Sequence, residues 1–313
     1  MYCTDCGNTL PDGAAFCPEC GSAVGTSSRK PKRQPRSRGW STFALCLLFM
    51  FLMIVGEVIG YVVGMGLGLD VDTSATVGGA VVSVLAVVVL GGGRLLVPTR
   101  AAMLEAFRTG WWLLAVNFGL AAFDLASVLL DESFVVTPGW PLRVLNVAVL
   151  CLAVGLSEEL AFRGLLLHGF LAVQGGTRRG MVAAVVTSSL LFGIVHIDWS
   201  TLDVHNALQV GQAVLKVLQT GVFGLLMAAI TLSSRSVIGP ALLHAISDFL
   251  LMVTYVGLQG ESTDIEYVAA SETEAWGVIM LYGFMILLYV PFVVKAVRMV
   301  REHPVPDHGA LRR

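Results

Sequence analysis

Two adjacent carboxylates and an arginine interrupt the long apolar run Leu142–Val173; they are Glu158, Glu159 and Arg163. An ionisable side chain is costly in hydrocarbon, so within such a run it usually faces a protein interior and serves a function. On a helix Glu159 and Arg163 stand four residues apart and can pair, whereas Glu158 lies about 100° further round. Desolvation makes a carboxylate a stronger base, which suits Glu158 to activating water. The spacing therefore predicts an ion pair beside a free acid; the alternative is a buried cluster that only holds helices together.

Two later apolar segments each carry a histidine at helical spacing from another side chain. Phe192 precedes His196 by four residues, and His244 precedes Asp248 by four. Residues four apart share one face of a helix, so Asp248 can orient or charge the His244 imidazole. A lone histidine on an apolar helix is more often a packing residue than a ligand. Two such histidines and an acid pair in one chain together predict a hydrolytic site inside the membrane.

The composition is that of a membrane protein. Of the 313 residues, 56% are hydrophobic and 13% charged, and the mean hydropathy is +0.78. The apolar residues gather in long runs with few charges, and these runs predict about eight spans that could cross a bilayer. They cover residues 42–69, 75–97, 111–130, 142–173, 180–197, 209–232, 237–258 and 275–297. We therefore predict an all-α polytopic membrane protein with about eight transmembrane helices around a polar cavity.

The loops between these spans alternate in charge. Basic residues cluster before the first span, around residues 94–108, and after the last span, while acidic residues occupy the loops between them. Lysine and arginine are enriched in cytoplasmic loops, and an even number of spans returns the chain to its starting side. We therefore expect an integral protein of the cell membrane with both termini in the cytoplasm and the lipid bilayer as its surroundings.

The first residues contain two paired-thiol motifs, formed by Cys3, Cys6, Cys17 and Cys20. Four cysteines in this spacing are typical of a tetrahedral structural zinc site, and the segment resembles small zinc-ribbon modules. A closed four-thiolate site leaves no position for substrate, so we predict a structural zinc and a docking role towards a cytoplasmic protein. Residues 1–24 form this predicted ribbon.

A basic linker, a membrane domain and a tail complete the predicted organisation. Residues 25–40 are rich in lysine, arginine, serine and proline, which predicts a flexible linker. We interpret its charge as a topology signal rather than as a site for anionic lipid, and do not expect nucleic acid as a partner. The membrane domain is predicted at 41–300 and a cytoplasmic tail at 301–313.

The order of the three polar motifs resembles a known family. The chain carries Glu-Glu-x-x-x-Arg at Glu158–Arg163, then Phe-x-x-x-His ending at His196, then His-x-x-x-Asp at His244–Asp248. This series resembles the CAAX protease and bacteriocin-processing family, also called the Abi family. These proteins are intramembrane endopeptidases. The resemblance implies about eight transmembrane helices around a cavity, with Glu158 and His196 activating the attacking water. It further implies that His244 and Asp248 stabilise the oxyanion while Glu159 and Arg163 brace the site.

One position departs from this pattern. Relatives commonly carry asparagine where this chain has Asp248, and an ionised carboxylate cannot donate a hydrogen bond to an oxyanion. Asp248 must therefore be protonated, hold His244 in place, or ligate a metal. Glu158, His196 and His244 could also supply a catalytic zinc site. The chain lacks the His-Glu-x-x-His helix typical of zinc proteases, and we favour water activated by Glu158 and His196.

These observations give a first hypothesis and two alternatives. The first is an endopeptidase that cleaves a peptide or membrane-protein substrate within or beside the bilayer, prenylated only if the host prenylates proteins. The second is a non-catalytic membrane scaffold or bacteriocin-immunity-type protein that docks partners through its zinc ribbon. The third is a transporter that uses the same buried charges.

Depth in the membrane is the main difficulty for a shared site. At 1.5 Å per residue, Glu158 lies roughly 20 Å and His196 about 24 Å from the cytoplasmic ends of their predicted spans. His244 comes out roughly 10 Å shallower if its helix begins at Val237. Tilt, or a cytoplasmic loop that dips inward, is needed to bring it level. We also expect His168, later on the same span as Glu158, at the cytoplasmic boundary.

Overall fold

The computed structural model describes residues 9–14, 36–131, 134–174, 176–263, 267–269, 271–305 and 311. The chain divides into two compact units, Met1–Gln34 and Pro35–Arg313. In the first unit the described residues form a turn, in which the Ala14 N–H donates to the Pro11 carbonyl at 3.2 Å. Gly13 adopts a φ of 80° in this turn, a conformation that glycine takes without strain. The four cysteines of the predicted zinc ribbon lie outside the described residues, as does most of the predicted linker.

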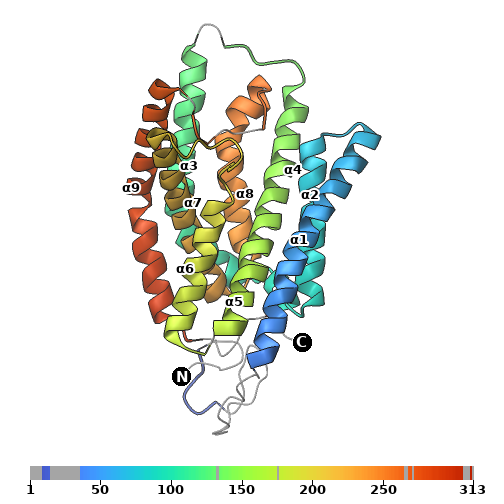
Figure 1. Ribbon diagram of the computed structural model, residues 1–313, viewed down its shortest axis with the longest axis vertical. Helices are drawn as coiled ribbons and strands as arrows, with labels where there is room; N and C mark the ends of the chain where they lie inside the picture. The colour runs from blue at the N-terminus through green and yellow to red at the C-terminus, as the bar shows by residue number, and fades with distance from the viewer. Residues whose placement is uncertain are drawn as a thin grey trace. The chain divides into compact units, whose positions relative to one another are not determined.

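All regular secondary structure in the described part of the second unit is helical (Figure 1). Its elements are α1 (Arg36–Leu67), α2 (Val71–Val89), the 3₁₀ turn η1 (Gly93–Leu96), α3 (Arg100–Leu130), α4 (Trp140–Glu159), the π-helix η2 (Leu160–Leu166), α5 (Leu167–Gln174), α6 (Arg178–Ile194), α7 (Ala207–Ser234), α8 (Ile238–Met252), the π-helix η3 (Val253–Gln259) and α9 (Glu272–Glu302). The first helix thus starts five residues before the predicted membrane domain, within the segment predicted as linker.

Every predicted apolar span corresponds to a helix in this unit, and seven of the described helices are long and apolar enough to cross a membrane. The remaining predicted span, residues 180–197, corresponds to α6, whose 17 residues extend about 26 Å at 1.5 Å per residue, slightly less than a typical hydrocarbon core. Large apolar side chains point outward, among them Phe118, Phe123 and Leu287 at 65%, 71% and 70% exposure. Such a surface suits lipid rather than water, so the protein is a multi-pass membrane protein.

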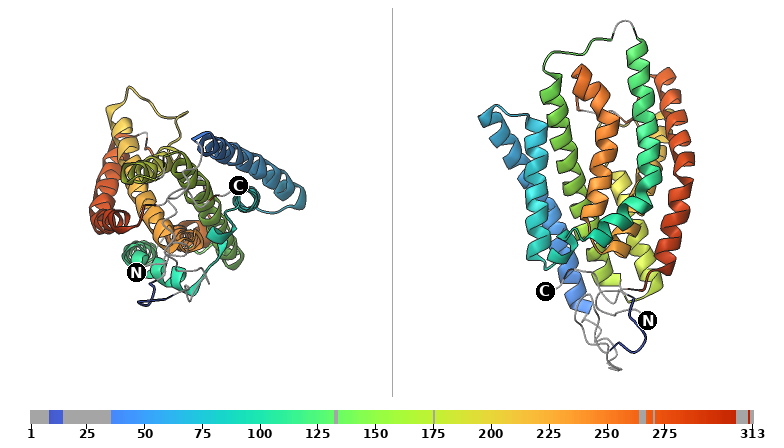
Figure 2. Two further views of the ribbon diagram at one scale, coloured as in Figure 1. Left: turned by 90° about the horizontal axis from the view of Figure 1, so that it is seen from below. Right: turned by 180° about the vertical axis from the view of Figure 1, so that it is seen from behind.

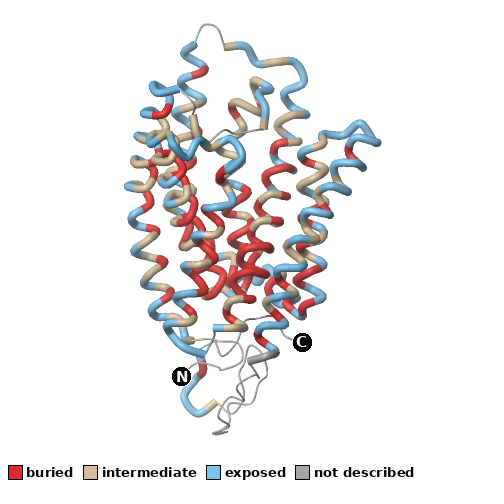
Figure 3. Tube along the Cα trace, viewed as in Figure 1, coloured by how far each residue is buried: buried red, intermediate tan, exposed pale blue. Residues whose placement is uncertain are grey.

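The helices α1 and α2 pack together on one side of this bundle, and α3 and α9 lie on the opposite side (Figures 1 and 2). Between them, α4 packs against α8, and α6 packs against α7. Buried positions gather on α4, η2, α6, α7 and α8, in the half of the bundle nearer to where α1 begins and α9 ends (Figure 3). The polar motifs lie on these inner helices, except that His196 follows the end of α6.

The span that carries the acid pair is a continuous helix that changes type directly after Glu159. α4 runs into η2 and then into α5, and π-helical turns inside α-helices often mark functional sites. The Nδ1 atom of His168 lies 2.6 Å from the carbonyl oxygen of Arg163, five residues earlier. His168 is only 4% exposed, so protein surrounds its imidazole, and its expected depth at the cytoplasmic boundary stays a prediction. The wider turn of η2 carries this histidine into the core.

The turn between α7 and α8 is buried rather than exposed. Arg235 takes a left-handed φ of 56°, and the next two residues, Ser236 and Val237, are 1% and 0% exposed. The Val237 N–H and the Ser236 hydroxyl both donate to the Leu95 carbonyl in η1, at 2.9 and 3.2 Å. The connection between α7 and α8 is therefore packed against η1, and His244 on α8 lies beside the acid pair, 3.0 Å from Glu159 and 3.8 Å from Glu158.

A glycine allows α4 and α8 to approach closely beside the acid pair. A methyl group on Gly155 would lie 3.0 Å from the Ala245 nitrogen and closer still to the Ala241 carbonyl oxygen. We expect Gly155→Ala to force the helices apart, to lower the free energy of unfolding by about 1–3 kcal/mol, and to impair any function that needs α4 and α8 in register. Gly119→Ala is the control, because nothing lies within 4 Å of its added methyl group. Unfolding in detergent measures both; equal stability of the two variants would contradict this role.

Candidate active site

The two neighbouring acids occupy different environments, as the helical periodicity predicts. The side chain of Glu159 is 0% exposed and that of Glu158 is 31% exposed. An Oε1 atom of Glu159 lies 2.9 Å from Nη1 of Arg163 and 3.0 Å from Nδ1 of His244. One buried carboxylate oxygen therefore joins η2 to α8. The Arg163 guanidinium also lies 4.0 Å from the centroid of the Phe192 ring, which adds a cation–π contact.

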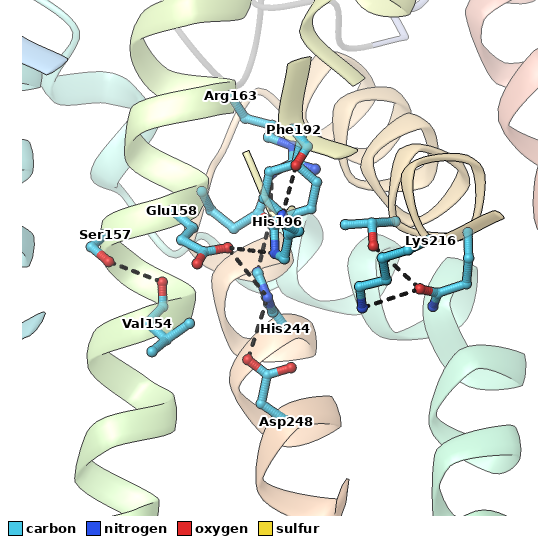
Figure 4. Close-up of polar contacts among 12 residues, drawn as sticks. Val154, Ser157, Glu158, Arg163, Phe192, His196, Lys216, His244 and Asp248 are labelled. Atoms are coloured by element: carbon cyan, nitrogen blue, oxygen red, sulfur yellow. Dashed lines mark hydrogen bonds and ion pairs between the residues drawn. The ribbon is translucent and has the colours of Figure 1, made fainter. Parts of the chain in front are cut away.

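The second acid faces both histidines. Oε2 of Glu158 lies 3.8 Å from Nε2 of His196 and 3.8 Å from Nε2 of His244 (Figure 4). These three side chains come from three segments that are distant in the sequence. Both separations exceed a direct hydrogen bond, but a water molecule donating to the carboxylate could bridge to an imidazole across such a gap.

The ring of His196 is oriented by the end of its helix. The sequence pattern predicts His196 within a helix, on the same face as Phe192. In the structure α6 ends at Ile194, and His196 lies just beyond this end. Its Nδ1 atom lies 2.7 Å from the Phe192 carbonyl oxygen, one of the carbonyls that a helix end leaves without an intrahelical partner. Because a carbonyl only accepts, Nδ1 must carry the proton. In the neutral ring, Nε2 then presents a lone pair towards Glu158.

Both ring nitrogens of His244 face carboxylates. Nδ1 faces Glu159, while Nε2 lies 3.4 Å from Oδ2 of Asp248 in addition to its approach to Glu158. An imidazolium would donate a hydrogen bond on each side of this arrangement. Asp248 keeps 29% of its side chain exposed and His196 keeps 18%. The cluster of acids and histidines is therefore buried on the side of Glu159 and accessible to solvent on the side of Glu158 and Asp248.

Aromatic rings hold the two histidines in place. The Phe192 ring lies 4.7 Å from His196 and 6.0 Å from His244, measured between centroids, and the Phe223 ring lies 4.8 Å from His244. Phe192 is 1% exposed, and packing of this density fixes rotamers. The phenylalanine of the Phe-x-x-x-His motif thus packs against both imidazoles and against Arg163.

Sequence reasoning overlooked one charged residue beside this group. Lys216 on α7 is 9% exposed, and its ammonium lies 3.8 Å from the centroid of the Tyr267 ring. The Tyr267 ring in turn lies 6.4 Å from that of His196. The polar residues of this span recur every three or four positions, at Gln209, Gln212, Lys216 and Gln219. Polar residues on one face of a membrane helix indicate a face that lines a protein interior, and this pattern could have identified Lys216 from the sequence.

The side chains around Glu158 also include possible metal ligands, His196 and His244. A catalytic zinc needs about three protein ligands converging on one point at roughly 2.0–2.2 Å. Among the residues that the structure describes, no three acid, histidine or cysteine side chains form a group that could hold a metal ion. Glu158, His196 and His244 bring one carboxylate oxygen near two imidazole nitrogens, each 3.8 Å from that oxygen.

Two family models match this chain. Residues 139–250 match the model described as type II CAAX prenyl endopeptidase, Rce1-like, and residues 2–24 match that of a zinc-ribbon domain. No curated protein and no solved structure matches the chain. The two matches confirm both resemblances that the sequence indicated: a zinc ribbon at the N-terminus and, after it, a CAAX-protease-like domain. The first supports an intramembrane protease acting on a peptide substrate in a lipid bilayer, and the second indicates zinc binding at the N-terminus.

Proposed function

We propose that this protein, which carries a CAAX-endopeptidase-like membrane domain, is an intramembrane endopeptidase that hydrolyses a peptide bond with water activated by Glu158 and His196. The observation that carries the proposal is the approach of Glu158 to Nε2 of both histidines at 3.8 Å, on the open side of the group. Buried ion pairs that only join helices would not leave a carboxylate 31% exposed beside an imidazole lone pair.

The residues divide the chemistry between them. Glu158 accepts a proton from the water, whose position the His196 lone pair fixes. The water oxygen then bonds to the carbonyl carbon, and the carbonyl electron pair moves onto oxygen. When the tetrahedral intermediate collapses, the carbon–nitrogen bond breaks and the leaving amine takes the proton from Glu158.

The remaining residues hold and polarise this arrangement. His244 lies next to Glu158, so its Nε2–H can stabilise the carbonyl oxygen as charge develops. Asp248 orients His244 and favours its charged form, a role open to an ionised carboxylate. Glu159 and Arg163 fix the other side of the ring. We propose a membrane-protein segment or a membrane-bound peptide as the substrate, and the cytoplasm as the side of both termini.

The N-terminal ribbon has a separate role in this proposal. Cys3, Cys6, Cys17 and Cys20 lie within the segment that matches a zinc-ribbon domain, and four thiolates would hold one zinc ion without an open position. That zinc would supply folding energy to the ribbon. We propose that the ribbon binds a cytoplasmic protein and does not take part in the cleavage step.

Metal content assayed beside peptidase activity tests both halves of the proposal. We expect the purified protein in liposomes to cleave a membrane-bound peptide, with products identified by mass spectrometry. The variant with all four ribbon cysteines changed to serine should lose about one zinc ion per chain and keep its peptidase activity. Zinc retained by this variant, with activity lost on its removal, would replace the glutamate mechanism by a metal-dependent one. A protein that cleaves no peptide, and whose Glu158→Gln/His196→Ala form still restores the phenotype of a deletion strain, would favour the scaffold.

A further inference from the structure

Lys216 is a charged residue inside a membrane-spanning helix for which the proposed mechanism has no use. It is 9% exposed. Its ammonium contacts the rings of Tyr267 and Tyr282, at 3.8 and 5.6 Å from their centroids, and the Gln219 amide oxygen at 3.4 Å. Among the described residues, no carboxylate oxygen lies within 4.0 Å of this ammonium. A buried charge without a counter-ion is costly, and in a membrane protein it marks a functional position.

The position of Lys216 relates it to the candidate active site. The Tyr267 ring lies between Lys216 and His196, with its centroid 3.8 Å from the Lys216 ammonium and 6.4 Å from the centroid of the His196 ring. Figure 4 shows the Lys216 side chain across His196 and His244 from Glu158. Tyr267 thus connects the Lys216 ammonium to the His196 side of the candidate active site.

The other cations of this region are already engaged. Arg163 pairs with Glu159 and is 1% exposed. His244 is already one oxyanion donor of the proposed mechanism, and its two nitrogens also face Glu159 and Asp248. An ionised Asp248 has no proton to donate. Lys216 is thus the cation near the two histidines whose donors are not taken by a described carboxylate.

We propose that Lys216 is a further catalytic residue, whose ammonium stabilises the oxyanion formed when water adds to the scissile carbonyl. This inference rests on the proposed function. The negative charge appears on the carbonyl oxygen as its electron pair moves away from carbon, and the water proton resides on Glu158 meanwhile. The ammonium keeps its own proton throughout, and its attraction is released when the carbonyl re-forms. The ammonium has no counter-ion before the reaction and gains one, the oxyanion, in the transition state. Because this attraction is stronger in the transition state than in the ground state, it lowers the barrier of the reaction.

The test compares Lys216→Met, which removes the charge at similar length, with Lys216→Arg, which keeps it. For Lys216→Met we expect kcat to fall about 100-fold, the loss typical of one oxyanion donor, with little change in KM. Lys216→Arg should recover at least part of that loss. A peptide with a phosphonate in place of the scissile amide, a tetrahedral anion, should bind Lys216→Met more weakly by the factor lost in kcat/KM. The uncleaved peptide should bind equally to wild type and variant.

Lys295→Met is the matched control. Lys295 is an ammonium on α9 that donates to the carbonyls of Arg108 and Thr109, at 3.0 and 3.3 Å, and kcat should not change. The inference is overturned if Lys216→Met retains kcat, or if substrate and phosphonate lose affinity equally, which would make Lys216 a substrate anchor. Cleavage that needs Glu158 but not Lys216 would leave the proposed function standing and remove only this inference. A wild-type protein that cleaves no peptide would remove both.

Discussion

Glu158→Gln lowers kcat for peptide cleavage by about 10³-fold, the range expected when a general base is removed, and leaves the protein folded. Glutamine keeps the size of the side chain but cannot accept the proton of an attacking water. The fold should survive because Glu158 has no direct hydrogen bond to lose: its closest charged neighbours, the two histidines, lie 3.8 Å away. Initial rates in liposomes measure the effect, and thermal unfolding confirms that the variant is intact.

Two further variants separate a specific role of Glu158 from a general loss of negative charge. Glu158→Asp moves the carboxylate back by one methylene and should retain more activity than glutamine, because the base is present but misplaced. Asp124→Asn removes another carboxylate from a membrane-spanning helix, α3, and should leave kcat unchanged. A Glu158→Gln protein as active as wild type would remove this residue from the mechanism.

Arg163→Met destabilises the protein by about 3–5 kcal/mol, the effect expected when a buried ion pair loses one partner. Arg163 and Glu159 are 1% and 0% exposed and lie 2.9 Å apart. Without the guanidinium, the Glu159 carboxylate stays buried with only His244 beside it. Activity should fall too, because that carboxylate positions the His244 ring. Equilibrium unfolding in mixed micelles provides the measurement.

The double variant Arg163→Met/Glu159→Gln provides the decisive comparison. Removing both charges leaves no uncompensated carboxylate, so most of the lost stability should return. Arg301→Met, at an exposed position on α9, controls for the loss of an arginine and should change stability by less than about 0.5 kcal/mol. A double variant as unstable as Arg163→Met alone would show that the packing of Arg163, and not its charge, matters.

Local periodicity explains what could be predicted from the sequence. The four-residue spacing of Glu159 and Arg163 predicts their pairing, and the adjacent position of Glu158 predicts that it points elsewhere; both relations appear in the structure. The helical spans were also predictable, because runs of apolar residues have few other stable forms. These features depend on residues within about one turn or on one continuous segment.

Features that depend on packing between distant segments could not be derived in this way. Hydropathy reports neither that the turn before α8 is buried against η1 nor that His244 lies beside the acid pair. Nor does it indicate that His196 lies beyond the end of α6. Lys216 escaped notice because a single lysine in an apolar span carries no motif, although the polar stripe around it repeats at helical spacing.

The π-helix η2 has a consequence for how related chains are aligned. Its wider turns accommodate roughly one more residue than an α-helix would use over the same rise. Every side chain after Leu166 is therefore rotated by about 100° from the direction that uninterrupted α-periodicity assigns to it. A homologue lacking one residue between positions 160 and 166 would conserve the acid pair and yet turn a different face of α5 inward. Gaps placed there by an alignment record a change of helical phase, not the loss of a surface loop.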